Sequence, residues 1–348
     1  MPRRAPPTAL LLAALVAACA PSRAMLVSQP LAPGRGWLSP LHQDHPLAGK
    51  IWDVRGQRFV DEATLVAALA GARTVLLGET HDNADHHVLQ ARLVRALDGA
   101  GRTPAVAFEM LSVEQQPTID AALAVPQPTA DALAAAVQWD RSGWPEFEMY
   151  RPVFVAAVDA KLRVIGANLP RKDVRRVVMD GEKALPPAVA ARIAKLGPPS
   201  PAEREALRKE MEEAHCGELP ETQMDPMILG QRARDAQMAE SVLAAGAPGG
   251  AVLVCGSQHA RLDRGVPAYL AGEGGPVVSL AFREVTPDHR APAEYAEDDE
   301  HGALPFDFVV FTPGAEREDP CEGLRAKMRS RKSAPQGKPA PAEPPKAP

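Results

Sequence analysis

The sequence has few aromatic residues and little excess charge, and both shortages restrict the kinds of ligand and partner that the protein can bind. Aromatic side chains make up 4% of the 348 residues, so aliphatic side chains should line any ligand pocket. The formal net charge is −5, from 39 Lys and Arg against 44 Asp and Glu. We therefore exclude nucleic acid as a partner, because domains that bind it carry a clustered basic surface. A Cys-x-x-Cys-His motif, the attachment site of c-type haem, is also missing.

The N-terminal apolar run is too short for a membrane-spanning helix but has the form of a secretion signal. Arg3 and Arg4 precede an apolar run from Ala9 to Ala18, which ends in Val16-Ala17-Ala18-Cys19. A charged start, a short apolar run and small residues before a cleavage site are typical of signal peptides. The pattern resembles a bacterial lipobox, in which Cys19 is lipidated and becomes the mature N-terminus. An uncleaved anchor and an ordinary secretory signal are the alternatives.

The expected chain organisation has four parts. Residues 1–18 form the signal peptide, and residues 19–46, rich in Pro, Ser and Gly, form a flexible tether. Residues 47–315 form one α/β domain, and the charged, Pro-rich residues 316–348 are a disordered tail. Attached lipid would supply the membrane affinity that the rest of the chain lacks. We therefore expect a lipid-anchored protein of the bacterial cell envelope. Ala20, rather than Asp, follows the cysteine, which is the pattern of sorting to the outer membrane if the host is Gram-negative.

Apolar runs of strand length alternate with helical patterns through the domain. Continuous apolar strands are typical of parallel sheets with helices on both faces. The fold class is therefore α/β, a mostly parallel central sheet flanked by helices, with a long helical insertion at about 171–245. The predicted strands lie at 73–77, 105–108, 163–167, 251–255, 277–282 and 306–311.

Three cysteines remain after Cys19, so at least one is unpaired within the chain. Cys255 lies in an apolar strand and is most simply a small core residue. Cys216 and Cys321 are then the candidates for a disulfide, which their spacing alone does not establish.

Two predicted strands end in similar turns, Gly78-Glu79-Thr80-His81 and Gly256-Ser257-Gln258-His259. Parallel sheets bind ligands beyond the carboxyl ends of their strands, so Glu79, His81 and His259 should meet in one pocket. These residues would serve a metal, a haem or acid/base chemistry. The alternative is a structural glutamate that holds the loop backbone, with a polar histidine nearby.

Polar residues also end the two strands that follow in the chain. Glu109 would lie beside Glu79 if their two strands are neighbours in the sheet, and paired carboxylates perform acid/base work or bind a cation. A carboxylate bonded to a helix start is the alternative for Glu109. Asn168 would orient a ligand or cap its turn. His86 and His87, on the helix after His81, would contact a ligand or lie solvated on the helix surface.

Further candidates have anion-binding or iron-binding chemistry. Tyr150 could ligate ferric haem as a phenolate, with Arg151 beside it for a propionate, or it could be a packing tyrosine. Arg261 follows His259 and could clamp an anionic group or form a surface ion pair. His215 with Cys216 could bind a soft metal, but the pair lacks partners at ligand spacing.

Together these motifs resemble the ChaN-like haem-binding uptake family, part of a wider superfamily with Tiki, TraB and erythromycin-esterase-like proteins. The resemblance runs from about Ile51 to Thr312. Its motifs include Leu76–Asn83, Phe108-Glu109-Met110, Tyr150-Arg151-Pro152, Val164–Arg171, His215–Pro220, Gln231–Ala239 and Gly256–His259. At the last strand, Asp307-Phe308-Val309-Val310 stands where the family often has Tyr and Trp, which leaves fewer flat surfaces for a porphyrin.

The resemblance implies haem uptake, with haem held noncovalently, a homodimer and an outer-membrane haem receptor as partners. It makes Tyr150 the iron ligand, with propionates on Arg151 or Arg261. His81 or His259 would support the haem, with Asn168 in the same site.

The alternative is a metal-dependent hydrolase from the esterase side of the superfamily. There His81, His259 and Glu109 would hold a divalent metal, and Glu79 would activate water.

Overall fold

The structure is a computed structural model that describes residue 31 and residues 36–246, 248–297, 302–319 and 321–323. The predicted signal peptide, Cys19, most of the tether and most of the tail lie outside these residues. Among the described residues, no helix combines the length and apolarity needed to cross a membrane.

One sheet of eight strands forms the centre of the molecule, with the order β2-β1-β8-β7-β3-β6-β4-β5. The strands from β8 to β5 run parallel, and β1 and β2 are added antiparallel at one edge. This confirms the predicted mostly parallel sheet. The strands are β1 Ile51–Asp53, β2 Arg58–Val60, β3 Thr74–Glu79, β4 Ala105–Ser112, β5 Val164–Asn168, β6 Ala251–Gly256, β7 Val277–Glu284 and β8 Phe308–Thr312.

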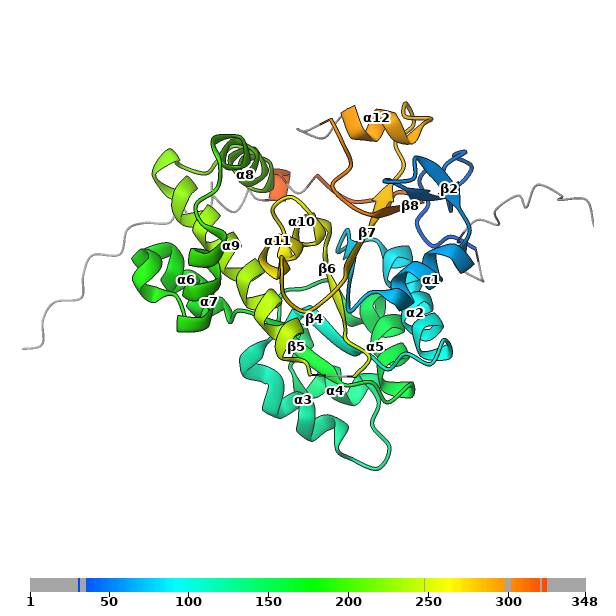
Figure 1. The fold of residues 1–348 in the computed structure, drawn as a ribbon, viewed down its shortest axis with the longest axis horizontal. Coiled ribbons are helices and arrows are strands. Elements are labelled where there is room, and N and C mark those ends of the chain that lie inside the picture. The colour runs from blue at the N-terminus through cyan, green and yellow to red at the C-terminus, as the bar shows by residue number, and fades with distance from the viewer. Residues whose placement is uncertain (1–30, 32–35, 247, 298–301, 320, 324–348) are drawn as a thin grey trace, which may run out of the picture.

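Helices cover both faces of this sheet (Figure 1), as its apolar strands require. In β3, Val75 and Leu77 face one apolar core with α1, α2 and α5, while Leu76 faces a second core with α6, α7 and α9. Both cores exclude solvent, so the strands are apolar on both faces rather than alternating. The longer helices are α1 Glu62–Gly71, α2 Ala84–Gly99, α3 Gln116–Leu123, α4 Ala130–Ala136, α5 Phe147–Asp159, α6 Arg171–Asp180, α7 Pro187–Leu196, α8 Pro201–Ala214 and α9 Glu221–Ala244. Shorter ones are α10 Ser257–Ala260, α11 Val266–Leu270 and α12 Pro292–Glu297.

The predicted helical insertion consists of α6 to α9, and these helices have two roles. The second half of α9 packs on the sheet through Ala233, Ala236 and Ala239, so it is the crossover from β5 to β6. The first half packs with α8 in a small separate core that includes Met211 and Ile228. We call α6, α7, α8 and the first half of α9 the cap. Figure 1 shows the cap helices gathered at one side of the sheet.

The domain extends beyond the predicted limits of 47 and 315. Within the expected tether, the backbone N–H groups of Leu38 and Ser39 donate to the Asp85 carboxylate at 2.9 and 2.8 Å. Within the expected tail, Arg317 forms ion pairs with Asp82 and Glu284. The side chains of α2 and β7 thus hold both flanking segments against the domain.

A disulfide joins Cys216, just after α8, to Cys321, 105 positions later in the sequence. Cys255 is free and buried, which confirms its interpretation as a core residue. The disulfide ties the cap to the segment that follows β8.

Candidate ligand-binding site

A pocket of about 770 Å³ lies at the carboxyl ends of β3, β4 and β6, beneath the cap. Polar side chains from the strand ends form its floor, and α6, α8 and α9 supply a mainly apolar wall. The floor residues are Glu79, His81, Glu109, Gln231, Arg234 and His259; the apolar wall residues are Val174, Val178, Met211, Ala214 and Met227. The predicted meeting of the two Gly-x-x-His turns at one pocket is therefore correct.

Glycine at the two turns allows this close approach. A Cβ at Gly256 would lie 3.0 Å from His81 Nε2, and one at Gly78 would lie 2.8 Å from the Ala260 Cβ. Larger residues would push the turns apart, so the two glycines set the spacing of the floor.

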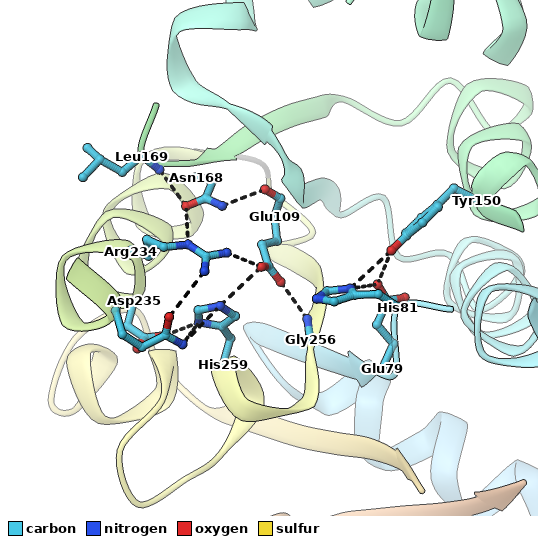
Figure 2. Close-up of polar contacts among 11 residues, drawn as sticks. Glu79, His81, Glu109, Tyr150, Asn168, Leu169, Arg234, Asp235, Gly256 and His259 are labelled. Carbon is cyan, nitrogen blue, oxygen red and sulfur yellow. Dashed lines mark hydrogen bonds and ion pairs between the residues drawn. The ribbon is translucent and has the colours of Figure 1, made fainter. Parts of the chain in front are cut away.

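Glu109 is the centre of one polar cluster, although only 1% of this residue is exposed (Figure 2). Its carboxylate pairs with Arg234, accepts the Gly256 backbone N–H at 2.7 Å and lies 3.3 Å from His259 Nε2. Burial raises the pKa of Glu109, but His259 and Arg234 outweigh it and hold the pKa well below its ordinary value. Glu109 is therefore an ionised, fully partnered carboxylate.

His259 is held between two carboxylates. Its Nδ1 lies 2.6 Å from Asp235, while its Nε2 faces Glu109. Burial lowers the pKa of His259, yet Glu109 and Asp235 together raise it to about 9. Each ring nitrogen thus lies near a carboxylate oxygen, which favours the imidazolium form of His259.

Glu79 is the centre of the second cluster, which Figure 2 shows beside Tyr150. His81 Nδ1 lies 2.9 Å from its Oε1, and the Tyr150 hydroxyl donates to the same oxygen at 2.9 Å. His87 Nδ1 lies 2.7 Å from Oε2, in ion-pair rather than hydrogen-bond geometry. Burial raises the pKa of Glu79, but His87 and His81 lower it to about 2. His81 itself reaches the pocket, with 35% of its side chain exposed.

The structure corrects the prediction of Tyr150 as an iron ligand. Its side chain is fully buried beneath the pocket, stacked against His87, and it does not line the cavity. Burial and the Glu79 carboxylate raise the pKa of Tyr150 far above its ordinary value. Tyr150 is therefore a neutral donor to Glu79, which contradicts the phenolate role.

Two predicted propionate partners also lie outside the pocket. Arg151 is on the outer surface of α5, where it pairs with Asp131 and Glu148. Arg261 is buried and bonded to Asp263. Asn168 does lie at the site's edge, where its amide donates to the Glu109 backbone carbonyl at 3.0 Å.

His86 and His87 are buried rather than solvated. The Thr80 N–H donates to His86 Nδ1 at 2.9 Å, so Nε2 carries the proton and faces Thr312 Oγ1 at 2.8 Å. Burial lowers the pKa of His86 to about 3. His87 Nε2 lies 3.1 Å from the His81 carbonyl. Both histidines hold the first turn in place, and neither lines the pocket.

The geometry does not support the predicted divalent-metal site. Glu109 is already paired with the guanidinium of Arg234, and the two ring nitrogens of His259 already face Asp235 and Glu109. Among the described residues, no group of three or more His, Cys, Asp and Glu is arranged to hold a metal ion.

The sequence interpretation missed the contribution of α9 and the cap. Arg234 and Asp235 lie three and four residues after Gln231, so the three side chains share one face of α9, and this face turns toward His259. That spacing was the available signal. Arg171 and Arg175 from α6 and His215 after α8 also line the pocket.

Comparison with known proteins gives the family. A family model described as "Haem-binding uptake, Tiki superfamily, ChaN" matches residues 65–270, which is more than half of the chain. The chain belongs to this family. The ChaN-family fold is also found in a solved structure from Campylobacter jejuni, described as cofacial heme binding to ChaN. It shares 22% identity and a TM-score of 0.59, covering 75% of this chain and 95% of that one.

A more remote similarity links this ChaN-family chain to an erythromycin esterase mutant, EreC H289N, in its open conformation. The identity is 15% and the TM-score 0.42, with 77% of this chain and 97% of that one covered. No curated protein matches the chain.

Proposed function

We propose that this protein binds haem noncovalently in the pocket beneath the cap and serves haem or iron uptake at the cell envelope. The observation that carries the proposal is the lining of this pocket in a member of a haem-binding uptake family. One wall is apolar, and cationic side chains lie along the same wall. The haem is cargo that the protein holds and passes on.

The residues present fit a porphyrin. The cavity of about 770 Å³ is within the usual range of small-molecule sites. Val174, Met211 and Met227 supply aliphatic and thioether surfaces, and thioethers adapt well to flat aromatic ligands. Trp144 adds an aromatic edge beside His81, at 4.9 Å between ring centroids. The apolar wall partly replaces the aromatic residues that the last strand lacks.

Arg171 and Arg175 suit the two carboxylates of haem. Both are exposed on α6 and line the pocket. Within the described part of the chain, neither forms an ion pair with a carboxylate. Guanidinium groups bind carboxylates through two parallel hydrogen bonds, so these arginines would orient the propionates. They take the role that the sequence interpretation gave to Arg151 and Arg261.

The cellular setting is part of the same proposal. Lipid on Cys19 would attach the protein to the membrane, and a homodimer or an outer-membrane haem receptor would be its partner. The lipobox pattern supports the lipid anchor, and the family's haem-binding role supports the receptor.

The test is a titration of the purified protein with ferric haem, followed by absorbance. We expect saturable binding, weakened about tenfold when Arg171 and Arg175 are both changed to Gln, because two charge-assisted contacts are lost. Haem dimethyl ester, which lacks the carboxylates, should bind the variant and the natural protein equally. Arg176→Gln is the matched control, since this arginine lies on the same helix but pairs with Asp173. An absence of saturable haem binding would contradict the proposal.

A further inference from the structure

The pocket is lined by three histidines, and their hydrogen bonds determine which of them can ligate iron. They are His81 on the floor after β3, His259 on the floor after β6, and His215 at the end of α8 in the cap. Only a ring nitrogen with a free lone pair can bind iron. Each histidine can therefore be judged from the partners of its two nitrogens.

His259 is the least suited, because its Nδ1 is bonded to Asp235 at 2.6 Å and its Nε2 is occupied by close contacts with Glu109 at 3.3 Å and the Gln231 amide at 3.4 Å. His81 has one carboxylate-bound nitrogen, with Nδ1 at 2.9 Å from Glu79. A Cβ at Gly256 would lie 3.0 Å from the second nitrogen of His81, so this ring stands between the two charged turns of the floor. Burial lowers the pKa of His81, but Glu109 and Glu79 raise it overall, which favours the imidazolium form.

His215 differs from both in its surroundings, because within the described part of the chain it forms no ion pair with a carboxylate. Its Nδ1 lies 2.8 Å from the Met211 carbonyl oxygen, which can only accept a hydrogen bond. Nδ1 must therefore carry the proton, and the lone pair is on Nε2. Nothing in the described part of the chain hydrogen-bonds to this Nε2. A metal-ligating histidine typically has this arrangement, with its other ring nitrogen bonded to a carbonyl or carboxylate.

The surroundings of His215 also suit an iron ligand. Met211, one turn earlier on α8, and Ala214 line the same pocket, so the imidazole stands beside the apolar wall. The next residue, Cys216, is bonded to Cys321, which ties the end of α8 to the segment that follows β8. A ligand needs such positional support, because a site built without it is poorly ordered.

We infer that His215, through Nε2, is the axial iron ligand of the bound haem, supplied by the cap rather than by the sheet. The inference rests on the proposed haem function. Met211 holds the tautomer through its carbonyl, and the Cys216–Cys321 disulfide holds the position of the ring. His81 and His259 then belong to the charged floor beneath the haem.

The test uses the ferrous nitrosyl form of the haem-loaded protein, whose EPR signal is split by a nitrogen ligand opposite the nitric oxide. We expect this splitting in the natural protein, its loss in His215→Gly, and its return when imidazole is added to that variant. His215→Gln should lose the splitting without imidazole, which guards against a folding defect of the glycine variant. His42→Gly, at an exposed position outside the pocket, is the matched control and should keep the splitting.

The outcomes separate the two proposals. Splitting that persists in both His215 variants, or that is lost only in His81→Gly, overturns the assignment of His215. Saturable haem binding without splitting in the natural protein overturns it as well, while the haem-binding function stands. No saturable haem binding in the natural protein overturns both.

Discussion

At the scale of single residues, the floor of the pocket is a set of charges that neutralise one another. Glu109 is paired with Arg234 and His259, while Glu79 is paired with His81 and His87. Breaking one such buried pair leaves an uncompensated charge, which costs about 3–5 kcal/mol. The floor therefore depends on the protonation of its histidines, and its stability should depend on pH.

The stability of the natural protein should fall between about pH 6.5 and pH 9 because of His259. The pKa of this group rises from 6.5 to about 9 on folding, so its contribution is complete below pH 6.5 and is lost as pH rises through 9. We expect a loss on the order of 2–3 kcal/mol over this window. His259→Gln, which cannot titrate, should lack this slope. Urea unfolding at several pH values measures the free energy of unfolding of both proteins. If this free energy changed with pH equally in the two proteins, His259 would not be charged.

Tyr150→Phe should reduce stability but leave the haem spectrum unchanged. The substitution removes a buried hydrogen bond to the ionised Glu79, which typically contributes about 1.5–3 kcal/mol. Thermal unfolding and the absorbance of the haem complex are the two measurements. Arg151→Gln is the control, because this neighbouring arginine is paired on the outer surface. A shifted haem spectrum in Tyr150→Phe would restore this residue as an iron ligand.

At the scale of elements, α8 contributes the part of the pocket wall that has the least support from the sheet. Its own apolar contacts are a small cluster with α9, which includes Leu207, Met211 and Met224. The covalent link from Cys216 to Cys321 compensates for this small core. The disulfide thus positions the wall that carries His215.

Cys321→Ser should destabilise the protein by about 4 kcal/mol, as expected for a cross-link that closes a loop of this length. Adding a reductant to the natural protein should lower its unfolding midpoint to that of the variant. The same reductant should leave Cys321→Ser unchanged. Equal unfolding midpoints of the natural protein with and without reductant would mean that the cross-link does not support the domain.

At the scale of the whole molecule, the domain is one sheet with a pocket near its middle and a cap beside it. β6 lies between β3 and β4 in the sheet, although it follows both β4 and β5 in the sequence. Because β6 lies beside β3 in the sheet, both Gly-x-x-His turns reach the same pocket floor. The proposed membrane attachment concerns the segment before the domain and can be tested independently of the pocket.

Cys19→Ser should release the protein from the membrane fraction while leaving its haem affinity unchanged. Lipid on a cysteine supplies membrane affinity through buried methylene groups, and no described helix could replace it. Cell fractionation followed by haem titration measures both properties. Ser28→Ala, at a position after the cysteine, serves as the control. Continued membrane association of Cys19→Ser would indicate an uncleaved anchor.

The sequence by itself determined the fold class and half of the floor. Apolar strands followed by Gly-x-x-His turns require a buried parallel sheet, and parallel strands bring their carboxyl ends to one edge. Glu79, His81, Glu109 and His259 could therefore be predicted to meet, because each lies within four residues of the end of a predicted strand.

Only the tertiary structure decided what these residues do. Partners such as Arg234 and Asp235 come from α9, and their contact with Glu109 and His259 depends on how that helix lies over the sheet. The packing of α5 against α2 buries Tyr150 beneath the pocket, and the position of α8 brings His215 to its lining. Protonation and access follow from such long-range contacts, which local sequence patterns do not encode.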